Sequence, residues 1–373
     1  MSGQPDLSSV VLAGGGSAGH VSPLLALADA LRARFPGVRL TVLGTSAGLE
    51  ARIVPARGYD LRFVPKVPMP RRPGPALLRL PGALRSAVRA ARDVVEETSA
   101  QVVVGFGGYV STPAYLAARA RGVPIVVHEQ NARAGLANRL GARFTPYVAT
   151  TFSQTRLAHA RRLGMPLRPE IKRFDRSVLR ATALASFGLD AQWPTVLVTG
   201  GSLGAQRLNH AFAESIGALS AAGVQVLHVT GLGKEFALPT GLAARAPYVV
   251  VPYLDRMELG YASADLVVCR SGANTVCELT AVGLPAVYVP LPVGNGEQRF
   301  NARDVVAAGG GILVEDAIVT PDWVRDTVLP LVADSGRLAR MGQAAASVGQ
   351  RDADERLVDL VAKAAASRQG ARS

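Results

Sequence analysis

The sequence predicts an α/β protein made of two doubly wound domains with a cleft between them. Short apolar, β-branched runs alternate with longer helical patterns along the 373 residues, which is typical of buried parallel strands in βαβ units. The two halves also resemble each other. VVLAGGGSAGH near the start and TVLVTGGSLGAQ about half a chain later each lead into an apolar helical segment. A chain of this length is long for one domain and sufficient for two.

The predicted elements follow in order along each half. In the first half we expect strands at residues 10–12, 40–43, 102–104 and 125–127, and helices at 24–34 and 113–121. In the second half we expect strands at residues 196–198, 224–229, 248–251, 266–268 and 286–289. Apolar runs this short, separated by helical segments, predict two parallel sheets that are buried on both faces.

Composition predicts where the domains begin and end. The segment GMPLRPEIKRF concentrates proline, glycine and charge, as a linker does. We therefore assign residues 1–168 to an N-terminal domain and 169–354 to a C-terminal domain. The remaining residues, 355–373, begin with an amphipathic helical pattern that we expect to pack back onto the N-terminal domain.

The net charge of +13 predicts an anionic partner, and a nucleic acid, an acidic membrane surface or a phosphorylated substrate would each fit. No helix-turn-helix, zinc module or aromatic-rich basic platform is evident, and aromatic residues make up only 5%. This argues against a nucleic acid. Between residues 62 and 92 there are eight Lys or Arg and no Asp or Glu, so part of the positive charge is concentrated.

The sequence also bears on the compartment. The N-terminus lacks a basic region followed by a signal-like apolar core, and no run of roughly 18 apolar residues occurs. Cys269 and Cys277 fit neither a disulfide framework nor a zinc site. We expect a protein that stays in the reducing cytoplasm, with both cysteines as small core or near-core residues.

Three glycine-rich turns each follow a predicted strand and open a helix, at residues 14–20, 105–111 and 200–205. Glycine lets backbone approach a ligand closely, and the N–H groups at a helix start suit phosphate oxygens. The first turn formally matches G-x-G-x-x-G, but a dinucleotide site expects an acidic residue at the end of the next strand. That strand ends in LGT, and Glu50 comes too late, which disfavours an oxidoreductase.

The segment CRSGANTVCELTAVGLPAVYVP is more informative. Its strand ends at Cys269 and a helix begins near Asn274 or Thr275, so the N–H groups of residues 273–275 would face a diphosphate. Glu278, one turn into the helix, can accept hydrogen bonds from a ribose diol. The alternative is a carboxylate that only stabilises the helix N-terminus, worth a few tenths to about 1 kcal/mol.

Seven motifs, in order along essentially the whole chain, resemble the MurG family of UDP-N-acetylglucosamine:lipid I transferases. They are GGGSAGHVSP, GFGGYVSTPA, HEQNARAGLANR, TGGSLGAQRLN, CRSGANTVCE, GLPAVYVPLP and GNGEQRFNA. The resemblance implies the GT-B fold, with two Rossmann-like domains and an interdomain cleft. It also implies inverting transfer of N-acetylglucosamine to the 4-hydroxyl of the lipid-linked muramyl pentapeptide (lipid I), giving lipid II and UDP. The enzyme would then be peripheral, on the cytoplasmic side of the cell membrane.

The resemblance implies that the C-terminal domain binds the UDP-sugar. Ser202 would contact the diphosphate, Leu254 the uracil and Gln298 the sugar. The phosphates and ribose would be held by a run of six residues, Ala273, Asn274, Thr275, Val276, Cys277 and Glu278.

The N-terminal domain would receive the acceptor. A sugar hydroxyl is too weakly acidic to ionise at neutral pH, so a base must take its proton. The resemblance gives this role to His20, which titrates near that pH; the alternatives are that His20 only caps its loop and that His128 is the base. His159, His210 and His228 are interpreted as structural, in helical or strand contexts. The other residues implied for the UDP-sugar are Ser17, Ala18, Gly19, Asn131, which would reach across from the first domain, and Arg168, and for the acceptor Tyr109, His128 and Glu129.

Two positions depart from the family pattern. Met165 replaces an asparagine in the segment that ends at Arg168, and Glu297 stands where relatives often have Gln or His. An Asp-x-Asp pair, which can hold a metal in sugar-nucleotide enzymes, occurs at Asp352 and Asp354. It lies far from any glycine turn, and residues two apart on a helix point in different directions. We therefore expect neither an obligatory metal nor a cofactor.

The basic stretch also contains leucines, and the two together suit an anionic membrane surface. The alternative is a solvated, proline-interrupted loop and helix. The residues concerned are Arg71, Arg72, Leu77, Leu78, Arg79, Leu80, Leu84 and Arg85. Two other functions remain open at this point, a UDP-sugar 2-epimerase on the same fold and a non-catalytic nucleotide-sugar or nucleic-acid binding protein.

Overall fold

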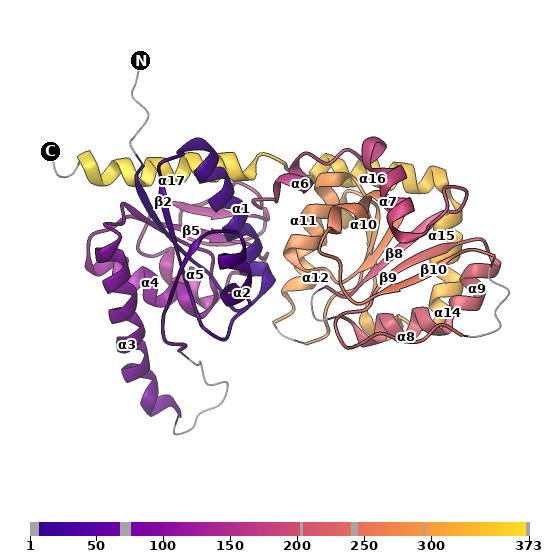
Figure 1. Ribbon diagram of the computed structural model, residues 1–373, viewed down its shortest axis with the longest axis horizontal. Helices are drawn as coiled ribbons and strands as arrows, with labels where there is room; N and C mark the ends of the chain where they lie inside the picture. Colours follow the sequence, from indigo (N-terminus) through magenta and orange to yellow (C-terminus); the bar gives the residue numbers. More distant parts are fainter. Residues whose placement is uncertain (1–6, 68–75, 202–203, 240–244, 294, 371–373) are drawn as a thin grey trace, which may run out of the picture. The chain divides into compact units, whose positions relative to one another are not determined.

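The computed structural model describes residues 7–67, 76–201, 204–239, 245–293 and 295–370. The chain folds into two compact units, unit 1 with residues 1–168 and 351–373 and unit 2 with residues 169–350 (Figure 1). The chain returns to unit 1 at Arg351, whereas the composition placed this boundary after residue 354. Within the described residues, no helix has the length and hydropathy needed to cross a bilayer.

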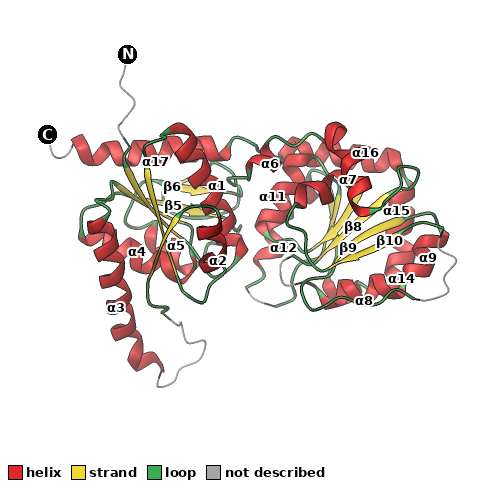
Figure 2. Ribbon diagram, viewed as in Figure 1, coloured by secondary structure: helices red, strands yellow, loops and turns green. Residues whose placement is uncertain are grey.

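Unit 1 contains a seven-stranded sheet in the order β3-β2-β1-β4-β5-β6-β7, with every pair parallel. Helices cover the sheet, as the colouring by secondary structure shows (Figure 2). Its strands are β1 Ser9–Ala13, β2 Arg39–Gly44, β3 Asp60–Phe63, β4 Val102–Gly105, β5 Ile125–Glu129, β6 Val148–Thr150 and β7 Ala160–Arg162. Its helices are α1 Ala18–Arg34, α2 Glu50–Ala56, α3 Ala76–Glu97, α4 Gly108–Ala120, α5 Leu136–Gly141 and α17 Ala353–Gly370.

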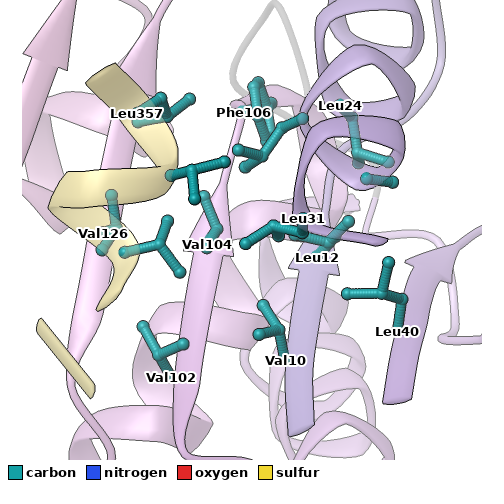
Figure 3. Packing of buried hydrophobic residues seen from close by; sticks show 14 of the residues in the cluster. Val10, Leu12, Leu24, Leu31, Leu40, Val102, Val104, Phe106, Val126 and Leu357 are labelled. Carbon is teal, nitrogen blue, oxygen red and sulfur yellow. The ribbon is translucent and has the colours of Figure 1, made fainter. Parts of the chain in front are cut away.

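The last helix belongs to the core of unit 1. Leu357 and Val361 of α17 are buried in the same cluster as Leu24 of α1 and Val104 of β4. Figure 3 shows Leu357 in this cluster, beside the strands that carry Val104 and Val126. Burying each such side chain contributes about 1.5–3 kcal/mol, so the C-terminal helix stabilises the unit in which the chain began.

Unit 2 repeats the plan with a six-stranded parallel sheet in the order β10-β9-β8-β11-β12-β13. Its strands are β8 Thr195–Thr199, β9 Gln225–Val229, β10 Tyr248–Val251, β11 Leu266–Cys269, β12 Ala286–Tyr288 and β13 Gly311–Leu313. Its helices are α6 Pro169–Lys172, α7 Arg176–Phe187, α8 Gln206–Glu214, α9 Ile216–Ala221, α10 Met257–Ser263, α11 Ala273–Val282, α12 Glu297–Asn301, α13 Arg303–Ala307, α14 Pro321–Trp323, α15 Leu329–Ala333 and α16 Ser335–Val348. A 3₁₀ turn at Asp316–Ile318 and a π-helical turn at Val324–Val328 complete it.

The two sheets therefore have the doubly wound order that the apolar runs predicted, and this prediction is confirmed. In such sheets the direction of winding reverses at one point, and ligands bind outside the carboxyl ends of the strands there. In unit 1 the reversal lies between β1 and β4, and in unit 2 between β8 and β11. All three predicted glycine turns follow strands at these reversals.

Candidate functional site

The first glycine turn joins β1 to α1. The helix begins at Ala18 and includes Pro23, so it starts six residues before the apolar pattern that predicted a helix at 24–34. Ser17 is the N-cap residue, but its side chain makes no capping bond. Its hydroxyl instead contacts Nδ1 of His20 at 3.0 Å. Ala18 and Gly19 lie in the same turn and are partly exposed, so the four predicted residues of this turn form one group.

The imidazole of His20 is partly exposed, and its electrostatic environment suits a proton acceptor. Burial lowers its pKa below the usual 6.5, while the Glu50 carboxylate and the backbone of Gly15 oppose that change. A histidine with such a pKa is neutral at pH 7. When Nδ1 donates to the Ser17 hydroxyl, Nε2 keeps its lone pair, which is the form that a general base requires.

The second glycine turn packs directly against the first. A Cβ at Gly108 would lie 2.7 Å from the carbonyl oxygen of Gly15, and one at Gly107 would lie 3.4 Å from Nε2 of His20. Both glycines have positive φ, +77° at Gly108 and +87° at Gly107, a region that side chains disfavour. The fold thus brings two of the three predicted glycine turns together around His20.

His128, the second candidate base, lies on β5 and is fully buried. Its Nε2 contacts the Gly164 carbonyl oxygen at 2.8 Å and its Nδ1 contacts the side-chain amide of Gln130 at 3.0 Å. Burial lowers its pKa to about 4. Because both ring nitrogens have partners inside the protein, this geometry suits a structural group better than a base in contact with substrate.

Glu129 is also buried and organises the loop that follows β5. Its carboxylate accepts hydrogen bonds from the N–H of Asn131 at 2.9 Å and of Gly135 at 3.0 Å, and from the side-chain amide of Asn138 at 2.9 Å. Burial raises its pKa, and these hydrogen bonds act against that change. Glu129 therefore fixes the backbone position of Asn131, which the resemblance assigns to the sugar.

The remaining predicted residues of unit 1 lie nearer its surface. Tyr109 is the second residue of α4, is 46% exposed and has the Lys66 ammonium 5.8 Å from its ring centroid. Arg168, partly exposed, is the last residue of unit 1 before the chain enters unit 2. Met165 is buried, so the departure from the family pattern places a thioether inside the protein.

The histidines interpreted as structural have different surroundings. His228 on β9 is buried and contacts the Tyr248 hydroxyl and Asn209. His210 is exposed on α8. His159 lies in an exposed turn with φ +59°, not in a helix or strand, so its predicted context is wrong. The turn reverses the chain just before the short strand β7, which has no apolar run to mark it.

In unit 2, the start of α11 has the backbone arrangement that suits an anion. The helix begins at Ala273 after the N-cap residue Gly272, which has no side chain to cap it. The first N–H groups of a helix lack partners within the helix, so those of residues 273–275 suit phosphate oxygens. Asn274, Thr275 and Cys277 are partly exposed, and Val276 is buried. The helix starts at Ala273, one residue before the start near Asn274 or Thr275 that the sequence predicted.

Glu278 lies one turn further along α11 and is partly exposed. One carboxylate oxygen accepts a hydrogen bond from the hydroxyl of Tyr261 at 2.8 Å. Tyr261 comes from α10 and is 1% exposed. A buried phenol thus holds the carboxylate that the sequence assigns to the ribose. Tyr261 could not be found from the sequence, because nothing in its own segment marks it.

Gln298 and Leu254 both lie in segments that follow strands of the unit 2 sheet, Gln298 in a helix and Leu254 in a loop. Gln298 is on α12, where its side-chain oxygen accepts the N–H of Leu291 at 3.0 Å. The Asn301 amide of the same helix donates to the Ser271 carbonyl at 3.2 Å, which ties α12 to the start of α11. Leu254, partly buried, follows β10. Ser202 lies outside the described residues, and Glu297 begins α12.

Three charged residues beside this site were not predicted from the sequence. Arg270, directly after β11, pairs with Asp316 at 2.6 Å, and Asp316 also pairs with Arg207 of α8 at 2.9 Å. They border a pocket of about 1050 Å³ that also includes Gly204 and Ala205 of the third glycine turn. Arg270 could have been found from the sequence, because it directly follows a predicted strand in the segment CRSG.

The Asp-x-Asp pair lies elsewhere. Asp352 pairs with Arg356 at 3.0 Å, and Asp354 is buried in the first turn of α17. Both belong to unit 1; Asp352 directly precedes the C-terminal helix and Asp354 lies within it. In the parts of the chain that the structure describes, no cluster of three or more His, Cys, Asp or Glu has the arrangement of a metal site.

Comparison with known proteins supports the same assignment of the two units. Residues 10–150 match the glycosyltransferase family 28 N-terminal domain and residues 195–357 the family 28 C-terminal domain. A relative from Nocardioides sp. is 60% identical over 353 residues, covering 94% of this chain and 97% of the relative. One from Streptomyces avermitilis is 55% identical, covering 96% and 99%. Both are named UDP-N-acetylglucosamine–N-acetylmuramyl-(pentapeptide) pyrophosphoryl-undecaprenol N-acetylglucosamine transferase.

A solved structure gives a comparison at the level of the fold. The crystal structure of Acinetobacter baumannii MurG has a TM-score of 0.77 and 29% sequence identity, covering 95% of this chain and 99% of that one. The likeness therefore extends over both units and is not confined to one nucleotide-binding half.

Proposed function

Since this chain belongs to glycosyltransferase family 28, we propose that it transfers N-acetylglucosamine from UDP-N-acetylglucosamine to the 4-hydroxyl of lipid I. The products are lipid II and UDP, and the reaction is a step of peptidoglycan synthesis. The observation that carries this proposal is 60% identity, over nearly the full length of both chains, to a transferase of that name. The epimerase and the non-catalytic binding protein lack such support.

The proposed chemistry begins at His20. Its Nε2 takes the proton of the acceptor hydroxyl as the oxygen attacks the anomeric carbon of the donor sugar. The new C–O bond forms as the bond from that carbon to the diphosphate breaks, and inversion at this carbon is what the family resemblance implies. The supporting points are that burial lowers the pKa of His20, that the Ser17 hydroxyl contacts Nδ1, and that Gly107 of the second glycine turn adds no side chain beside Nε2.

The departing UDP gains negative charge, which the start of α11 is suited to stabilise. Backbone N–H groups that are already oriented need no rearrangement as charge develops, and the helix dipole acts in the same direction. Glu278, held by Tyr261, accepts hydrogen bonds from the ribose hydroxyls. In this proposal unit 2 binds the UDP-sugar and unit 1 receives the acceptor.

The proposal extends to the membrane, on its cytoplasmic side. Helix α3 buries Ala87 and Ala91 against unit 1, whereas Arg85 and Arg89 are exposed and Leu84 is partly exposed. Exposed basic residues near apolar ones favour an anionic lipid surface, where a lipid-linked acceptor resides. The side chains of the other residues predicted for this surface, Arg71, Arg72, Leu77, Leu78 and Arg79, lie outside the described residues.

A UDP-release assay tests the proposed function. UDP should form from UDP-N-acetylglucosamine when lipid I is present, and only slowly without it. A 2-epimerase of the kind that releases UDP would not need lipid I, and a binding protein would release none under either condition. NADH, added as a control ligand, should not compete with the UDP-sugar.

A further inference from the structure

A buried carboxylate lies beneath the first glycine turn. Glu50, the first residue of α2, is 0% exposed. Its Oε2 accepts the N–H of Gly16 at 2.8 Å, and its Oε1 accepts the N–H and the hydroxyl of Thr45, each at 2.9 Å. Both oxygens are therefore engaged by the loops that follow β1 and β2. Glu50 comes too late in the sequence to be a ribose ligand of a dinucleotide site. The structure instead places its carboxylate against the first glycine turn.

Three glycines make room for this carboxylate. A Cβ at Gly15, Gly44 or Gly48 would come closer than 3.0 Å to side-chain atoms of Glu50, a separation that real Cβ atoms essentially never show. Any larger residue at these positions would push the carboxylate away from the turn. Gly15 of the first glycine turn, together with Gly44 and Gly48, thus leaves space for the Glu50 side chain.

The same turn carries the proposed base. The N–H of Gly16 donates a hydrogen bond to Glu50. The next residue is Ser17, whose hydroxyl contacts Nδ1 of His20. We propose that Glu50 is a positioning residue for the transfer reaction: it fixes the turn that presents His20, and its charge stabilises the imidazolium formed when the acceptor gives up its proton. This rests on the role of His20 as base in the proposed function.

The carboxylate has the charge that this role needs. Burial alone would raise the pKa of Glu50, but hydrogen bonds from Gly16 and Thr45 outweigh it, so its pKa is lowered and the group is ionised at neutral pH. A buried negative charge strengthens the binding of a proton to a nearby imidazole. Removing it would leave His20 with the effect of burial, which disfavours the charged form.

No other charged group acts on the His20 ring in this way among the residues that the structure describes. The Ser17 hydroxyl and the Gly15 backbone belong to its own turn. Across from it lie Gly107 and, near the position of a Gly107 Cβ, the amide of Asn138. The Glu129 carboxylate bonds that amide and does not contribute to the pKa of His20.

The test uses Glu50→Gln, which keeps the side-chain shape and removes the charge, in the full-length protein. The matched control is Thr45→Ala, which removes one hydrogen bond to the carboxylate and leaves its charge. NMR titration of the His20 ring in the absence of substrate measures the pKa directly, with His20→Ala to assign the signal among five histidines. The acidic limb of the kcat/KM profile gives the same quantity during turnover.

We expect the pKa of His20 to fall by about half a unit or more in Glu50→Gln, and by less in Thr45→Ala. Turnover of Glu50→Gln should fall about tenfold or more, with the KM for UDP-N-acetylglucosamine changed less than about twofold, because the UDP-sugar site is in unit 2. An unchanged His20 pKa in Glu50→Gln would overturn the inference, since a purely structural carboxylate would leave that titration where it was.

Two further variants keep the test decisive. If Glu50→Gln does not fold, Glu50→Asp keeps the charge and shortens the reach, so turnover should fall while the His20 pKa stays nearly constant. Wild-type turnover in Glu50→Asp would overturn the inference. If His20→Ala itself keeps its turnover, the proposed base fails. The substrate-free titration then still shows whether Glu50 sets the basicity of His20, so the two failures are distinguishable.

Discussion

The hydroxyl of Tyr261 donates a hydrogen bond to the carboxylate of Glu278 at 2.8 Å. The two residues lie 17 positions apart on different helices, and the tyrosine is buried while the glutamate is partly exposed. A donor fixed in the core sets the direction in which the carboxylate presents its second oxygen. This contact makes the ribose role that we propose for Glu278 testable through two separate residues.

Glu278→Ala should weaken the binding of UDP and of UDP-N-acetylglucosamine by about 1.5–3 kcal/mol, the range for losing hydrogen bonds to a charged group. Isothermal titration calorimetry measures this without turnover. Glu297→Ala, also a carboxylate at the carboxyl edge of the unit 2 sheet, is a matched control and should bind almost as tightly as wild type. Wild-type affinity in Glu278→Ala would remove that residue from the site.

Tyr261→Phe should weaken UDP binding less, by about 0.5–1.5 kcal/mol, because only the orientation of Glu278 is lost. In the double variant with Glu278→Ala the Tyr261 change should add almost nothing, since the tyrosine acts through the carboxylate. Additive effects in that double-mutant cycle would mean that Tyr261 influences the nucleotide by another route.

His20→Ala should lower turnover by about 10²–10⁴, as expected when general base catalysis is lost, with little change in UDP-sugar affinity. Because burial lowers the pKa of His20, the acidic limb of the kcat/KM profile should have its midpoint below 6.5. The sign follows from the base being active when neutral: activity falls as the pH drops through that pKa. Turnover within a few-fold of wild type in the variant would mean that His20 is not the base.

Acid should destabilise unit 2 through His228. Its folded-state pKa is lowered to about 3 by burial, whereas in the unfolded chain it is near 6.5. Between these values the unfolded state binds the extra proton, so stability is lost as the pH falls below 6.5. By pH 5 this one group should cost about 2 kcal/mol. Urea unfolding at pH 7 and pH 5 measures how much the free energy of unfolding falls between the two. That fall should be smaller for His228→Gln than for wild type, and an equal fall would contradict the prediction.

Charge reversal on α3 should release the protein from anionic vesicles. Arg85→Glu with Arg89→Glu changes two exposed arginines of unit 1, and Arg337→Glu with Arg340→Glu makes the same change of net charge on α16 of unit 2. Only the variant with the first pair of changes should lose binding to anionic vesicles. Binding of the wild-type protein should weaken as salt shortens the Debye length. Co-sedimentation with anionic and neutral vesicles measures it. The stronger reversal of Arg71, Arg72, Arg79 and Arg85 should have a larger effect.

If both pairs of variants bind anionic vesicles equally, or if wild type is indifferent to headgroup charge, the basic stretch is only a solvated surface. Activity on a short-chain, water-soluble acceptor should survive in either pair, because those arginines lie outside the UDP-sugar site.

The strands at the centre of each sheet could be predicted from sequence because they are buried on both faces. β1, β5, β8 and β9 are buried along their whole length. Each contains a short apolar run, although β5 ends in His128 and Glu129 and β9 includes Gln225 and His228. The edge strands of unit 1 could not be predicted in this way, whereas β10, at one edge of the unit 2 sheet, carries an apolar run and was predicted. β3 is exposed or partly exposed at every residue and β7 is exposed throughout, so neither contains an apolar run.

The site was predicted in part, and the division has a physical cause. Glycine turns and helix starts are local, so the turn before α1 and the start of α11 could be located from their own residues. Glu50 and Tyr261 act through contacts with residues 34 and 17 positions away, and no local pattern marks such contacts. Only the folded chain shows that Glu50 belongs to the glycine turn that it supports.

The central claim is that this chain moves the sugar of UDP-N-acetylglucosamine onto lipid I with His20 as base. The most direct measurement follows labelled N-acetylglucosamine from UDP into the lipid fraction, for wild type and for His20→Ala, with each protein shown by calorimetry to bind UDP. We expect label in a disaccharide-linked lipid only when lipid I is present, and a rate of labelling about 10²–10⁴ lower for His20→Ala. Label that stays with the nucleotide or appears as free sugar in the presence of lipid I, or an equal rate in the variant, would contradict it.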